Sequence, residues 1–74
     1  MSEHEYKEMV QRKAKAAQKV LEFEMIMFGY ATLSGNKKEI AEAKARMEKA
    51  SKESLKWQQE YYLVFHEAYT GEEK

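Results

Sequence analysis

The 74-residue sequence contains no cysteine, no proline and no aspartate, and it has only three glycines. Without cysteine the chain can form neither disulfides nor thiolate metal sites, which excludes a disulfide-stabilised secreted scaffold. With so little glycine and no proline, almost nothing interrupts a helix. No apolar run approaches the roughly 20 residues needed to cross a bilayer, and no leader-like segment is visible. We therefore expect no membrane contact and a cytoplasmic location.

The chain also lacks an excess of charge of either sign, because 13 acidic side chains balance 13 basic ones. A protein without net charge has no overall field that steers it toward nucleic acid, so a claim of that kind must rest on local patches. Hydrophobic residues make up 43% of the chain, and nine of them are alanines. A single small domain with so little large apolar area is stabilised poorly by itself, and we expect self-association to complete its core.

Helix signals divide the chain into two segments. Ser2 followed by Glu5, and Asn36 followed by Glu39, both have the spacing of a capping box, which starts a helix. Gly35 precedes the second box and can adopt the left-handed conformation that ends a helix. The sequence thus predicts one all-α domain: a helix over 3–33, a turn over 34–36, a helix over 37–70 and a charged tail over 71–74.

A three-four alternation of mostly small or apolar residues runs along the second helix from position 40 to position 68, with Ser54 as its one polar member. The first helix has a broader stripe that Lys13 and Glu24 interrupt. A three-residue turn makes the helices antiparallel, so the numbers of facing residues should sum to about 70. Glu24 then falls opposite Arg46, and we interpret that pair as a device that fixes the register.

Each helix also has apolar residues away from this seam. The first helix has them near the turn and the second near the open end of the hairpin. If two hairpins pack with their turns at opposite ends, the stripes of one copy meet those of the other. We therefore expect a homodimeric four-helix bundle, with another oligomer or a partner-protein groove as the alternatives. The expected interface residues are Phe23, Ile26, Tyr30, Leu33, Leu55, Tyr62 and Tyr69.

Aromatic side chains crowd the end of the second helix, opposite a basic turn of the first. Aromatic faces beside cationic groups suit a stacked base with its phosphate held nearby. The alternative is that the rings fill the open end of the core while Lys13 lies over Trp57. The candidate residues for binding an anionic ligand are Tyr6, Arg12, Lys15, Lys19, Trp57, Tyr61 and Tyr62.

Other chemistries find little support. His4 and His66 sum to 70, yet neither has the carboxylate or histidine spacing of a metal-binding bundle. No phosphate-binding glycine loop, zinc motif or Ser/His/Asp set is present. We therefore expect no metal, no cofactor and no enzymatic activity.

The sequence favours a small, non-enzymatic, oligomeric helical binding or regulatory protein, of the kind that phages and plasmids encode. Its partner would be another protein, RNA or a small anionic ligand such as a nucleotide. In layout alone the expected hairpin resembles the short RNA-binding helical hairpins that regulate plasmid copy number, with which it shares no motif. That resemblance implies a dimeric RNA-binding hairpin as one alternative. A designed or purely structural bundle is the other, because residues 35–56 consist almost wholly of strong helix formers.

Overall fold

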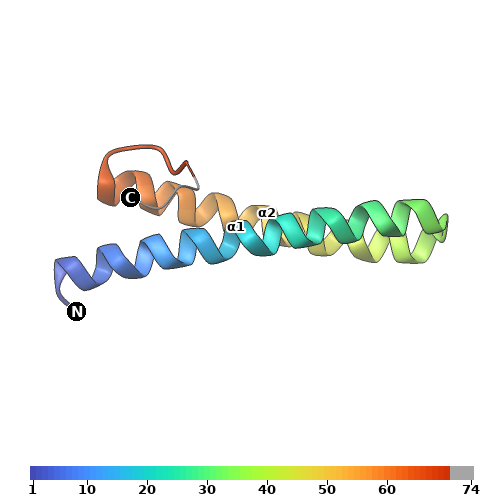
Figure 1. Ribbon diagram of the computed structural model, residues 1–74, viewed down its shortest axis with the longest axis horizontal. Coiled ribbons are helices and arrows are strands. Elements are labelled where there is room, and N and C mark those ends of the chain that lie inside the picture. Colours follow the sequence, from blue (N-terminus) through green and yellow to red (C-terminus); the bar gives the residue numbers. More distant parts are fainter. Residues whose placement is uncertain (71–74) are drawn as a thin grey trace.

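The computed structural model describes residues 1–70 as two antiparallel helices joined by a tight turn (Figure 1). Helix α1 spans Glu3–Ser34 and helix α2 spans Lys37–Phe65. The described part is a rod of 48 × 20 × 16 Å, with the start of α1 and the end of α2 at one end and the turn at the other. The prediction of an all-α antiparallel hairpin is confirmed. No helix within the described residues is long and apolar enough to cross a membrane.

Both predicted helix starts are present. The Ser2 hydroxyl accepts a hydrogen bond from the Glu5 amide at 3.2 Å, and the Asn36 side chain accepts one from the Glu39 amide at 3.1 Å. Each bond satisfies an amide that has no partner inside the helix. Gly35 ends α1 with φ of 72°, in the left-handed region that glycine enters without a steric cost. Local chain chemistry alone therefore produces the hairpin turn.

The seam between the helices is built mainly from small side chains. The buried residues of α2 are Ala43, Ala50, Ser54 and Tyr61, and those of α1 are Val10, Ala14 and Ala17. All of them belong to the two stripes expected from the sequence. Small residues on facing helices allow the two backbones to come close. The interior is consequently narrow, and many large apolar side chains lie outside it.

Three polar contacts confirm the register. Glu24 Oε2 accepts a hydrogen bond from Arg46 Nε at 3.2 Å, and these residue numbers sum to 70. Ser54 Oγ lies 3.3 Å from Gln18 Oε1, and the Tyr6 hydroxyl donates to Glu60 Oε2 at 2.9 Å. The residue numbers of these two pairs sum to 72 and 66, close to the expected sum of about 70.

The predicted end of the second helix is wrong. Helix α2 ends at Phe65, five residues before the expected position 70, and His66 has φ of 58°. The His66 amide still donates to the Tyr62 carbonyl at 2.8 Å, and the chain then turns back along the hairpin (Figure 1). This reversal packs Tyr69 edge-on against Tyr61, with ring centroids 5.1 Å apart. The expected tail over 71–74 lies outside the described residues.

The Glu24–Arg46 pair offers a test of the register. The Glu24 side chain is only 14% exposed and that of Arg46 is 54% exposed. Replacing Glu24→Lys puts a second cation beside Arg46 in a partly desolvated place, and we expect the free energy of unfolding to fall by about 1–3 kcal/mol. Thermal unfolding followed by circular dichroism measures it.

The charge-swapped double variant, Glu24→Lys with Arg46→Glu, is the matched control. It restores opposite charges and should recover most of the lost stability. If the double variant is as unstable as the single one, the pair does not act through its charges.

Candidate functional site

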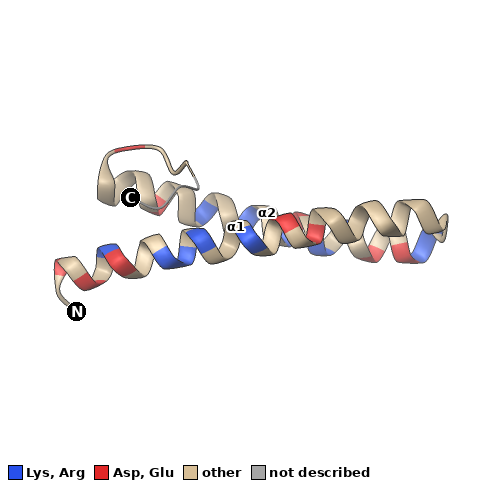
Figure 2. Cartoon of the chain, viewed as in Figure 1, with Lys and Arg blue, Asp and Glu red and all other residues tan. Residues whose placement is uncertain are grey.

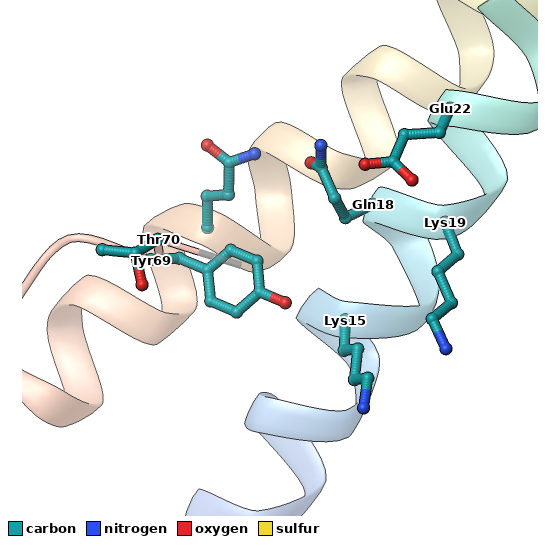
Figure 3. Close-up of a pocket in the computed structure, with 7 residues that line it drawn as sticks. Lys15, Gln18, Lys19, Glu22, Tyr69 and Thr70 are labelled. Carbon is teal, nitrogen blue, oxygen red and sulfur yellow. The ribbon is translucent and has the colours of Figure 1, made fainter. Parts of the chain in front are cut away.

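A polar hollow of about 460 Å³ lies where the reversed carboxyl-terminal segment meets α1 (Figure 3). One wall comes from successive turns of α1 and the other from the end of α2 and the segment after it. In Figure 3 the Tyr69 hydroxyl points toward α1, while the amino groups of Lys15 and Lys19 point to one side of that helix. The lining residues are Lys15, Gln18, Lys19, Glu22, Gln58, Tyr69 and Thr70.

A chain of polar contacts joins the two helices beside this hollow. Ser54 is 1% exposed and donates its hydroxyl hydrogen to Gln18 Oε1. The Ser54 oxygen accepts in turn from Gln58 Nε2 at 3.1 Å. The buried hydroxyl thus both donates and accepts a hydrogen bond, which explains a serine in an otherwise apolar stripe. The sequence identified Ser54 only as an exception to the pattern.

Two tyrosines have perturbed acidity. Burial raises the pKa of Tyr69 above its ordinary value of 10, and the neighbouring Tyr61 and the charge of Glu22 raise it further. The pKa of Tyr6 is raised chiefly because its hydroxyl donates a hydrogen bond to the Glu60 carboxylate, with desolvation and the charge of Glu60 adding to the effect. Both shifts favour the protonated phenol, and the Tyr6 hydroxyl uses its hydrogen in the bond to Glu60.

The structure separates the residues expected to bind an anion. Lys15 and Lys19 line the hollow, and Tyr62 borders a neighbouring one. Arg12 is exposed and is not among the lining residues of the polar hollow, and Tyr6 is engaged with Glu60.

Most of the aromatic residues near the end of α2 make packing or hydrogen-bond contacts within the hairpin. Tyr61 is only 5% exposed and stacks on Phe65, with ring centroids 4.4 Å apart. The Trp57 indole donates to Glu53 Oε1 at 2.9 Å. The cation over the Trp57 ring is Lys56, 5.1 Å from the ring centroid, and not Lys13 as expected; Lys13 is exposed. The aromatic wall of the polar hollow comes from Tyr69 and not from the rings expected from the sequence.

A second candidate surface is the turn half of α1. Seven large apolar side chains are exposed there, from 37% for Met27 to 84% for Leu33. Residues 25–34 contain no charged side chain, and the corresponding part of α1 is uniformly tan in Figure 2. At 3.6 residues per turn, all of them except Met25 fall on one side of the helix. We call this surface the α1 apolar face, and its residues are Val20, Phe23, Ile26, Met27, Tyr30 and Leu33.

The apolar residues of α2 lie on the other side of the hairpin. Val20 and Met27 border hollows that contain Arg46. Leu55 and Tyr62 instead border a hollow of about 480 Å³ together with Tyr69 of the reversed segment. The expected stripe of Leu55, Tyr62 and Tyr69 is therefore not a continuous helical row, because Tyr69 lies beyond the end of α2.

Neither histidine is placed as a metal ligand. His4 Nε2 lies 3.0 Å from Glu8 Oε1, within one exposed turn of α1. His66 forms the left-handed end of α2. Within residues 1–70, no group of three or more potential ligands could hold a metal ion.

Comparisons with protein-family models, curated proteins and solved structures find no match for this chain. Its two surfaces must therefore be interpreted from their own chemistry.

The stability contributed by the Tyr6–Glu60 hydrogen bond at the open end of the hairpin should decrease in alkaline solution. Because the pKa of Tyr6 is raised on folding, its contribution is complete below the unfolded value near 10 and is lost as pH rises through the higher folded value. We expect Tyr6→Phe to be less stable than the parent protein at neutral pH. The difference should shrink in strongly alkaline solution. Thermal unfolding at both pH values measures this effect. A spectrophotometric titration should also lose one late-titrating tyrosine.

Proposed function

We propose that this protein is a non-enzymatic helical binding protein that works as an oligomer, with the dimer as the favoured form. The observation that carries the proposal is the α1 apolar face. Monomeric proteins rarely expose a contiguous apolar patch of this kind, and such patches mark sites of protein association. A dimer of this hairpin contains four helices, and the narrow alanine-rich seam is a reason for the chain to need a second source of buried apolar area.

The positions of the two apolar surfaces limit the ways in which two copies can associate. Because the α1 apolar face and the Leu55–Tyr62 surface lie on opposite sides of the hairpin, one two-fold-related copy cannot cover both at once. The mutual exchange of stripes expected from the sequence is thus disfavoured. The α1 apolar face has six large exposed side chains, whereas the α2 surface has three, which are Leu55, Tyr62 and Leu63. Association through the α1 apolar face is the arrangement that this geometry supports.

The assignment to a non-enzymatic class rests on the roles of the reactive side chains. The chain has no cysteine, and three of its four serines, Ser2, Ser34 and Ser54, make structural hydrogen bonds, while Ser51 lies exposed on α2. Both histidines also take part in helix-end or intrahelical contacts. These side chains are thereby engaged in structure rather than arranged around a reaction centre.

Sedimentation equilibrium of the unmodified protein tests the proposal directly. We expect a mass above that of the 8.8 kDa monomer at micromolar concentration. Replacing Ile26→Glu should weaken association about a hundredfold or more, because a carboxylate would be buried without a partner. Leu63→Glu is the matched control, since Leu63 is similarly exposed but borders the α2 surface. It should leave the mass unchanged.

A monomeric parent protein in the same measurement contradicts the proposal. Equal effects of the two glutamates would show that association does not depend on the α1 apolar face. Circular dichroism of each variant separates a loss of association from a loss of helix.

The polar hollow supports a second candidate function, the capture of a small anionic ligand. The specific observation is that Lys15, Lys19 and Tyr69 line the same hollow, which combines cations with an aromatic wall. The oligomer would then carry this hollow on each copy. A nucleoside monophosphate is a suitable probe, because it has both a phosphate and a flat base.

Isothermal titration with that probe tests the second function. Lys19→Glu should abolish binding, and added salt should weaken it, because the attraction is mainly between exposed charges. The Lys13→Glu variant is the control, since Lys13 is an exposed lysine of the same helix and does not line the hollow. An unmodified protein that does not bind the probe at low salt eliminates this function.

A further inference from the structure

The six residues of the α1 apolar face are spaced symmetrically along the helix, so the pattern reads the same in both chain directions. Positions 20, 23 and 26 lie at the same distances from the point between Ile26 and Met27 as positions 33, 30 and 27. At 3.6 residues per turn all six fall within an arc of roughly 140°, on the side of α1 away from its buried residues. Such a patch is self-complementary, as a closed two-fold interface requires.

We propose that two copies of this chain pair through α1, antiparallel, about a two-fold axis between Ile26 and Met27. Val20 then meets Leu33 of the second copy, and Phe23 meets Tyr30. Ile26 meets Met27 at the axis. Every large side chain of the face thereby contacts an apolar side chain. This inference rests on the proposed function and names the occupant of the α1 apolar face.

Charge favours the antiparallel orientation. The nearest lysine on the outer side of α1 is Lys19, and this arrangement brings it beside Ser34 of the second copy, the last residue of that helix. The last turn of α1 contains no basic residue of its own, so the cation faces the negative end of the helix dipole. A parallel pairing would instead align Arg12, Lys15 and Lys19 with the same residues of the second copy.

The area of the face is large enough for a stable dimer. Six side chains of this size, each about half exposed, offer on the order of 100 Å² apiece and roughly 600–800 Å² per copy. A standard specific interface buries about 800 Å² on each partner. The centre of the face is also free of charge, so association requires no desolvation of an unpaired ion.

Single cysteines test this geometry, because the chain has none of its own. We expect a short bismaleimide to link Phe23→Cys to Tyr30→Cys when the two variants are mixed. It should also link Met27→Cys to itself, because that position is next to the axis. Val20→Cys should not link to itself, since antiparallel pairing places the two copies of that residue about 20 Å apart. Gln59→Cys, on the exposed surface of α2, is the control and should stay unlinked.

The outcomes separate this inference from the proposed function on which it rests. A parent protein that sediments as a monomer overturns both. A dimer in which Val20→Cys links to itself has parallel α1 helices, and one that links through Gln59→Cys uses α2. Either result overturns the antiparallel pairing through α1 but agrees with the proposal that the protein is an oligomer. Sedimentation of each cysteine variant before cross-linking shows whether the substitution itself has changed the mass.

Discussion

The close contact of small side chains at the centre of the hairpin is the constraint on which the rest of the structure depends. Ala14 and Ala17 of α1 and Ala50 and Ser54 of α2 are all buried. Side chains of this size leave no room for a wide interior, so the two helices pack along a narrow seam. They also bury little apolar area, which at about 25 cal/mol per Å² is the main source of stability in a folded chain. A seam of this kind fixes how the two helices are aligned, but it contributes little to the stability of the hairpin.

The polar contacts reinforce this alignment. The Glu24–Arg46 pair on one side of the seam and the Gln18–Ser54–Gln58 chain on the other have partners only in one register. A shift of either helix by one turn would leave a buried hydroxyl or a partly desolvated carboxylate without its partner. The hairpin therefore owes its specificity to a few polar groups, although each is worth little by itself.

The large apolar side chains that the seam excludes lie exposed on both sides of the hairpin. Beside α2, the reversed segment brings Ala68 and Tyr69 against Leu55 and Tyr62, within a single chain. Beside α1, six such side chains share one face and are 37–84% exposed, while Leu55, Tyr62 and Leu63 of α2 are 54–66% exposed. Stability and association are therefore linked, because a copy that covers the α1 apolar face adds the buried area that the alanine seam does not supply.

The sequence by itself determined the two helix starts, the left-handed Gly35, the antiparallel pairing and the register. These features depend on interactions between residues close in the chain or on a periodicity that one helix carries along its whole length. Tertiary structure alone decided where α2 ends, because the sequence around His66 has no helix breaker and the turn is accompanied by the packing of Tyr69 on Tyr61. It also decided that the two apolar surfaces lie on opposite sides, and that Trp57 pairs with Lys56. Such placements depend on which flank of the seam each side chain occupies, and a periodic pattern does not specify that until both helices are positioned in space.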